Sequence, residues 1–219
     1  MPNSGASPPR WPTPATYGEW CAIYKKLVNW EIELTDSTDD SIREILSYQE
    51  NEADNEFGKF VKRNYLDWIN RRDSSTPVMS HTLLRTRVFP IVEEHEKTTL
   101  LVIDNFRYDQ WRSINSLLHG YYDVESEDFY CSILPTATQY ARNALFAGLM
   151  PLAIDKIMPD RWLNDNEEGG KNQYEEEFLK RLMAQNGKTG NSRSTSSCAP
   201  NRAAGWSTIY KKCTTPISR

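Results

Sequence analysis

The chain has 219 residues, 38% of them hydrophobic, and a formal net charge of −4 at pH 7, so it can hold one large or two small domains with a modest core. The acidic balance argues against binding of the whole chain to nucleic acid or to an anionic membrane. We expect a cytoplasmic protein with no membrane contact, because the four cysteines show no disulfide framework, no apolar run reaches the roughly 18 residues that cross a bilayer, and the N-terminus lacks the apolar core of a signal peptide.

The two ends of the chain differ in composition from its middle. Every Asp and Glu lies between Glu19 and Glu177, whereas both ends are rich in Pro, Ser, Thr, Asn or Gly. We expect residues 1–16 to form a disordered N-terminal tail. Two interpretations of residues 185–219 stay open: a disordered basic tail, or a translated frame that is no longer the native one.

Apolar residues at intervals of three and four predict a helical bundle over residues 17–95. The first helix should bury a stripe that includes two tryptophans, and Asp39 or Asp40 should cap the second helix. A third, shorter helix should begin at Ser80 and end near Pro90, because two helices cannot close a core alone. The expected core positions are Trp20, Ile23, Leu27, Trp30 and Leu34 in the first helix and Ile42, Ile45, Leu46, Ala53, Phe57, Phe60, Val61, Trp68 and Ile69 in the second.

After residue 95 the pattern changes from helical to alternating strand and helix. Short apolar runs at Thr99 to Ile103 and at Phe129 to Leu134 read as buried strands, and Arg107 to Leu118 between them reads as a helix. Their spacing suits a βαβ crossover. The sequence therefore predicts an α+β chain: a helical bundle followed by the start of an α/β domain with a parallel sheet.

Polar residues follow both predicted strands. Asp104 ends the first, and Thr136 and Thr138 stand between the second and the next helix, so a parallel sheet would bring them to one edge. A buried Asp104 needs a metal ion or Arg107, unless it caps the following helix. One threonine can serve as an N-cap, and the other can act as a nucleophile where the helix N-terminus favours a phosphate.

Two motifs, VIDNFRYDQW and LPTATQYARNALFAGLMP, resemble the start of the PglZ domain, a branch of the alkaline phosphatase superfamily. YKKLVNWEIEL, REILSYQ and GKNQYEEEFL are also similar to response regulators of the type IX secretion system, in which a receiver domain, a helical bundle and a PglZ-type phosphatase domain follow one another. The resemblance covers about Trp20 to Met183 and implies a partial alkaline-phosphatase-like domain over residues 96–184.

The resemblance also implies a set of site residues. Asp104 would be the first metal ligand, and Thr138, rather than Thr136, would be the nucleophile and bind metal too. In related phosphodiesterases the pattern P-T-x-T followed by L-x-x-G-x-x-P has its nucleophile at the second threonine, and it lies on Pro135 to Pro151 without a gap. The implied cofactor is a pair of zinc ions, and the implied substrate is a phosphate ester or nucleotide. Gln139, Tyr140 and Ala141 depart from the residues that usually follow the nucleophile.

The later Asp and His ligands of the family are missing. We expect His81, His95 and His119 to be surface or loop residues rather than ligands. We therefore interpret the chain as a fragment of a two-component response regulator with a zinc-dependent phosphatase or phosphodiesterase domain, with little or no activity of its own. The alternatives are a non-catalytic helical signalling or dimerisation module, with a second copy or a signalling protein as partner, and a truncated inactive product.

Overall fold

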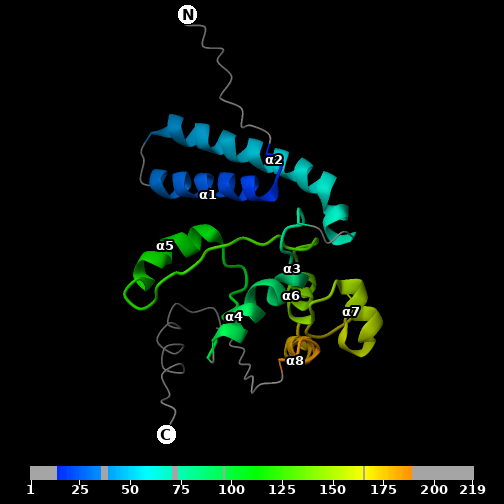
Figure 1. Ribbon diagram of the computed structural model, residues 1–219. Coiled ribbons are helices and arrows are strands. Elements are labelled where there is room, and N and C mark those ends of the chain that lie inside the picture. Colours follow the sequence, from blue (N-terminus) through cyan, green and yellow to red (C-terminus); the bar gives the residue numbers. More distant parts are fainter. Residues whose placement is uncertain (1–13, 36–38, 71–73, 96, 165, 189–219) are drawn as a thin grey trace, which may run out of the picture. The chain divides into compact units, whose positions relative to one another are not determined.

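The computed structural model describes residues 14–35, 39–70, 74–95, 97–164 and 166–188 (Figure 1). The chain divides into two units, Met1–Leu182 and Met183–Arg219, and all contacts described below lie within the first. The tails predicted at 1–16 and 185–219 fall almost wholly outside the described residues, and the domain boundaries stay predictions. The helices are α1 (Tyr17–Leu34), α2 (Asp40–Asn70), α3 (Ser80–Leu83), α4 (Phe89–Glu94), α5 (Tyr108–Leu118), α6 (Thr138–Ala147), α7 (Pro151–Ile157) and α8 (Glu175–Gln185).

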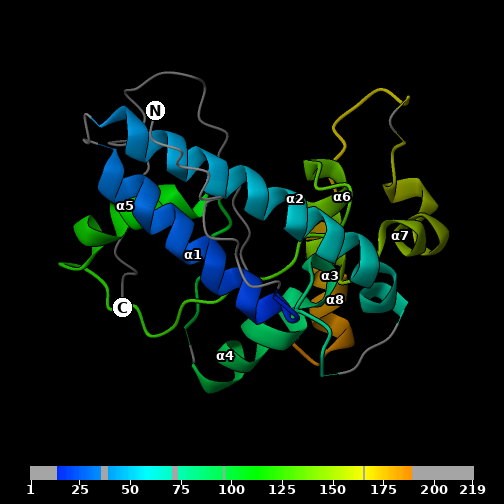
Figure 2. The same cartoon turned by 90° about the horizontal axis from the view of Figure 1, so that it is seen from above.

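Helices α1 and α2 lie side by side, as predicted from their apolar spacing (Figure 2). A capping box begins α1: Thr16 Oγ1 accepts from the Glu19 N–H at 3.2 Å, and the Glu19 carboxylate accepts from the Thr16 N–H at 3.0 Å. Asp39 caps α2, because its Oδ1 accepts from the Ser41 N–H at 2.9 Å. Both helix starts thus follow from local hydrogen bonding that the sequence makes visible.

The core between α1 and α2 is aromatic and contains fewer residues than predicted. Trp20 packs against Phe57 and Phe60, with ring centroids 5.4 and 6.0 Å away. Trp30 is 41% exposed, so the prediction that both tryptophans are buried is wrong. Ile42 and Ile45 are exposed as well. Two helices bury only the stripe that each turns to the other, and these side chains lie outside it.

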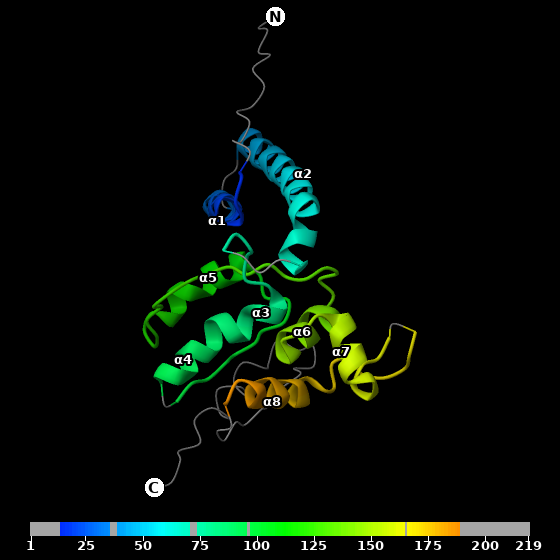
Figure 3. The same ribbon diagram turned by 45° about the vertical axis from the view of Figure 1, so that its right-hand side comes forward.

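The third helical segment continues past its predicted end at Pro90. A π-helical turn, Leu84–Val88, joins α3 to α4, which runs on to Glu94 (Figure 3). Proline lacks an N–H group, and its ring crowds the carbonyl four residues earlier. The wider π turn directly before α4 accommodates both effects, so the helix continues.

The predicted parallel sheet is wrong: the described residues contain no strand, and one isolated parallel bridge joins Met79 to Cys131. The Cys131 N–H donates to Val78 O at 2.7 Å, and the Ser80 N–H donates to Cys131 O at 3.2 Å. Because α3 begins at Ser80, this pairing cannot extend, and a strand needs a hydrogen-bonded neighbour along its length.

The two predicted strands also differ in burial. The run from Thr99 to Ile103 is exposed, and Leu101 is 77% exposed. In the second run Ile133 is fully buried, and the Leu134 N–H donates to Tyr65 Oη of α2 at 2.7 Å. An apolar composition alone did not show which run has neighbours. The described part of the chain therefore consists of helices and connecting loops and is not α+β.

Helix α6 contributes to two hydrophobic clusters. Ala144 belongs to the cluster of α1, α2 and Ile133, whereas Ala147 belongs to a cluster with Ile154, Trp162 and Phe178 from α7, the following segment and α8. This double contact fixes α6, and with it the position of Thr138 at its first turn. Within the described residues, no helix combines the length and apolar content needed to span a membrane.

Candidate functional site

Asp104 and Thr138 lie together. Thr138 Oγ1 donates to Asp104 Oδ2 at 3.4 Å, although 34 residues separate them. Asp104 sits at a turn in which Asn105 has a left-handed φ of 54° and donates its N–H to Asp104 Oδ1 at 3.0 Å. The N-cap of α5 is Arg107, so Asp104 does not cap that helix. This removes the simplest structural explanation for its position.

The two threonines occupy different positions at the start of α6. Ala137 is the N-cap and gives no side-chain hydrogen bond, so neither threonine caps the helix. Thr138 is the first helical residue, whereas the exposed Thr136 makes no hydrogen bond to Asp104. Of the two hydroxyl groups, only that of Thr138 is directed to the carboxylate.

Arg142, rather than the predicted Arg107, pairs with Asp104. Its Nη1 lies 3.3 Å from Asp104 Oδ2, and its Nη2 lies 2.6 Å from Glu175 Oε2. Arg107 instead pairs with Asp109, with 2.9 Å between Nε and Oδ1. Arg142 follows Thr138 by four residues in α6, and this spacing places both side chains on one helix face. This four-residue spacing from Thr138 is the feature of the sequence that could have indicated Arg142 as a site residue.

Residues just before and at the start of α8 complete the site. Asn172 Nδ2 donates to Thr138 O at 3.3 Å and to Asn143 Oδ1 at 3.2 Å. The buried Asn143 donates in turn to Lys171 O at 2.9 Å. Burial raises the pKa of Glu175, while Arg142 acts in the opposite direction. The motif GKNQYEEEFL, noted in the sequence only for its resemblance, therefore supplies residues that hold the first turn of α6.

The residues present do not fit a two-zinc centre. No group of three or more His, Cys, Asp or Glu side chains in the described ranges could hold a metal ion, and zinc sites in proteins use three or four such ligands. His95 and His119 follow the last turns of α4 and α5. His81 is buried in α3, so the expectation of a surface residue is wrong there. Asp104 already has Arg142 as its cation.

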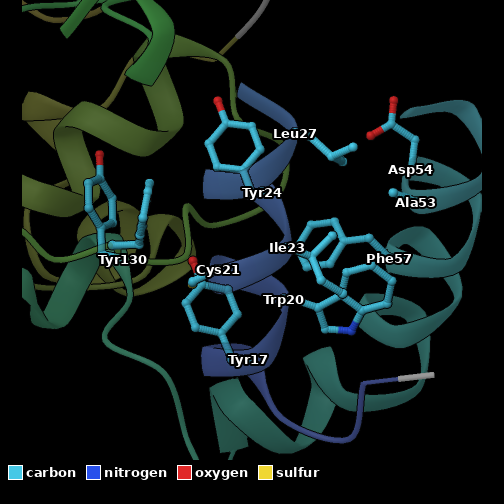
Figure 4. A pocket seen from close by; sticks show the side chains of 11 residues that line it. Tyr17, Trp20, Cys21, Ile23, Tyr24, Leu27, Ala53, Asp54, Phe57 and Tyr130 are labelled. Atoms are coloured by element: carbon cyan, nitrogen blue, oxygen red, sulfur yellow. The ribbon is translucent and has the colours of Figure 1, made fainter. Parts of the chain in front are cut away.

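A cavity of about 280 Å³ lies elsewhere, along α1 and α2 (Figure 4). Its lining includes Trp20, Ile23 and Phe57, which belong to or pack on the first hydrophobic cluster, and it contains neither Asp104 nor Thr138. Burial raises the pKa of the Cys21 thiol at this cavity, so the nucleophilic thiolate is disfavoured. We assign the cavity to helix packing rather than to the candidate site.

Two family models match the chain. Residues 83–198 match the BREX system PglZ alkaline phosphatase-like domain, and residues 11–69 match the PorX response regulator linker domain. These matches confirm the resemblance that the sequence motifs indicate. No curated protein matches the chain. The first range contains Asp104, Thr138, Arg142 and Glu175, and the second contains α1 and nearly all of α2.

Proposed function

The chain belongs to the PglZ alkaline phosphatase-like family, and on this premise we propose that it carries the threonine side of a phosphohydrolase site within a PorX-like response regulator. Thr138 is the proposed nucleophile, and a phosphate ester or nucleotide is the proposed substrate. The observation that carries the proposal is the hydrogen bond from Thr138 Oγ1 to Asp104 Oδ2 at the first turn of α6.

The position of Thr138 suits attack on phosphorus. The first N–H groups of a helix have no intrahelical partner, and the helix dipole favours negative charge at this end. Asp104 orients the hydroxyl group and can accept its proton as Oγ1 bonds to phosphorus and the ester oxygen leaves. Thr136 has no such carboxylate partner, and we propose Thr138 over Thr136 for this reason.

The family name points to metal dependence in general, and we propose zinc, as two ions, for the complete site. Asp104 and Thr138 are the ligands proposed from this chain. A pair of zinc ions needs several further Asp and His ligands, which the described residues do not bring together. We therefore propose little or no hydrolysis by this chain alone. Calorimetric titration with zinc chloride tests this, and tight stoichiometric binding at two sites would overturn it.

The nucleophile is tested in a longer protein that carries this segment and hydrolyses bis-p-nitrophenyl phosphate. Thr138→Ala should lower kcat by about a thousandfold, because the attacking oxygen is lost. Thr136→Ala is the matched control and should leave kcat within about twofold of the wild-type value. Equal losses in the two variants, with unchanged circular dichroism, would contradict the assignment.

The linker match favours a second role for the helical part, as a cytoplasmic signalling or dimerisation module of two-component type IX secretion regulation. Trp30 of α1 is 41% exposed, which suits contact with a second copy or with a signalling protein. Trp30→Ala should then shift a dimer toward monomer in analytical ultracentrifugation, whereas Thr138→Ala should not. If Trp30→Ala does not change the oligomeric state, the proposed dimerisation role fails and the hydrolase proposal is unaffected.

A further inference from the structure

We propose that Arg142 is a positioning residue whose guanidinium bridges Asp104 and Glu175 and, in this chain, keeps a divalent metal ion from Asp104. Its two Nη atoms contact one carboxylate each, at 3.3 Å and 2.6 Å. The consequence for catalysis rests on the proposed role of Thr138 and Asp104, but the ion pairs themselves do not. The cation at these two carboxylates is thus supplied by the protein itself.

The charges explain why the guanidinium is needed. Asp104 and Glu175 carry two negative charges, and Arg142 supplies one positive charge between them. The side chains of Glu175 and Arg142 are only 17% and 29% exposed, so water screens this part of the cluster incompletely. Removing the guanidinium would leave two carboxylates that attract a divalent cation.

The two contacts differ in strength, and the difference indicates which carboxylate is exchangeable. The contact with Glu175 is short and less exposed, whereas that with Asp104 is longer, and the Asp104 side chain is 46% exposed. The remaining donor of Arg142, Nε, is buried and has no hydrogen-bond partner in the described part of the chain. Glu175 therefore anchors the guanidinium, and Asp104 is the carboxylate from which a metal ion could displace Arg142.

Arg142 consequently has two effects at the site. It holds Asp104 beside Thr138, because Thr138 Oγ1 and Arg142 Nη1 contact the same oxygen, Oδ2. It also competes with a divalent metal for that oxygen. The spacing of Thr138 and Arg142 by one helical turn ties both effects to the rigid backbone of α6.

The test is the affinity of the full chain for Mn²⁺, measured from the electron paramagnetic resonance signal of the free ion. Mn²⁺ prefers carboxylate, carbonyl and water oxygens, which limits binding at the cysteines. Arg142→Gln and Arg142→Met both remove the charge and should tighten Mn²⁺ binding by at least about tenfold. Arg142→Lys, the charge-conserving control, should bind Mn²⁺ as weakly as the wild type.

Second substitutions locate the effect. Adding Asp104→Asn to Arg142→Gln should abolish the gain, since one of the two carboxylates is lost. In the wild-type background, Asp104→Asn alone should leave Mn²⁺ affinity unchanged, because Arg142 already occupies that carboxylate. The Mn²⁺ affinity of Asp104→Asn alone concerns an exposed side chain, and it does not depend on the folding of the Arg142 variants.

Three results would overturn the inference: no gain in folded Arg142→Gln or Arg142→Met, a gain that survives Asp104→Asn, or a loss of Mn²⁺ affinity in Asp104→Asn alone. None of these readouts requires turnover. If Thr138→Ala leaves hydrolysis in a longer protein unchanged while the Mn²⁺ results hold, the proposed nucleophile fails and the role of Arg142 as resident cation stands.

Discussion

At the scale of single residues, the backbone conformation and the close neighbours of Gly148 both require glycine, and a substitution can test this. It ends α6 with a left-handed φ of 62°, and an added Cβ would lie 2.6 Å from Leu182 Cδ1 and 3.1 Å from the Arg85 guanidinium. Arg85 Nη1 also donates to Gly148 O at 2.8 Å. Gly148→Ala should therefore lower the free energy of unfolding by about 2 kcal/mol, from backbone strain and displaced neighbours.

Gly58 provides the matched control for this substitution. It lies inside α2, and an added Cβ would meet no atom within 4 Å apart from its chain neighbours and the adjacent backbone of its own helix. Gly58→Ala should raise the free energy of unfolding by about 0.5–1 kcal/mol, because alanine restricts the unfolded chain and favours helix. Urea denaturation followed by circular dichroism measures both variants. A stabilising Gly148→Ala would contradict the conformational argument.

The sequence predicted some residues of the site and missed others for a physical reason. Asp104 and Thr138 were expected to lie together, and this is confirmed by their hydrogen bond. That expectation rested on a sheet that the structure lacks, so helix α6 and the turn at Asp104 make the contact instead. Arg142 was missed because 38 residues separate it from Asp104 in the sequence, whereas ion pairs depend on distance in space.

At the scale of elements, Glu127 ties α1 to α5. Its carboxylate accepts from Lys25 Nζ, Tyr108 Oη and Trp111 Nε1, each at 2.9 Å. Lys25 belongs to the range matched by the PorX linker, and the other three residues belong to the PglZ range. Glu127→Gln should destabilise the chain by about 1–3 kcal/mol at pH 7, because three donors lose a charged acceptor.

The pH dependence of this effect has a defined sign. Burial raises the pKa of Glu127, but the hydrogen bonds from Lys25, Trp111 and Tyr108 outweigh it and hold the pKa below its usual value. The unfolded chain therefore binds the proton more readily, and the stabilisation is complete above the unfolded pKa and lost as pH falls through the folded one.

Wild type and Glu127→Gln should accordingly differ most near pH 7 and converge in acid. Free energies of unfolding from urea titrations between pH 3 and 7 check this. Asp128→Asn is the neighbouring control: Asp128 is 61% exposed and lies 3.6 Å from Arg87, so its loss should cost less than about 0.5 kcal/mol. A pH-independent difference for Glu127→Gln would show that the carboxylate charge is not responsible.

Helices were predictable from the sequence and strands were not. The three- and four-residue spacing of Trp20, Ile23 and Leu27 by itself predicts a helix, because it places apolar side chains on one face that is buried. The runs at Thr99 to Ile103 and Phe129 to Leu134 are both short and apolar, yet only the second is partly covered, by α2 and the segment before α3. A short apolar run does not reveal its neighbours, and burial depends on them.

At the scale of the whole described molecule, α6 links the two hydrophobic clusters. Ala144 is buried in one and Ala147 in the other, and Tyr140 packs against both. A helix shared in this way cannot leave one cluster without disturbing the other. We therefore expect the two clusters to unfold together rather than as independent parts.

Phe178→Ala tests this coupling. Phe178 is 1% exposed and belongs to the cluster of Ala147, Ile154 and Trp162, so its truncation should cost about 3–5 kcal/mol. Hydrogen exchange measured by mass spectrometry should then show faster exchange in peptides of α2 as well as of α7. Leu152→Ala, at a 65% exposed position of α7, should leave both unchanged. Faster exchange confined to α7 and α8 would mean that α6 does not couple the clusters, and that Thr138 is held by the second cluster alone.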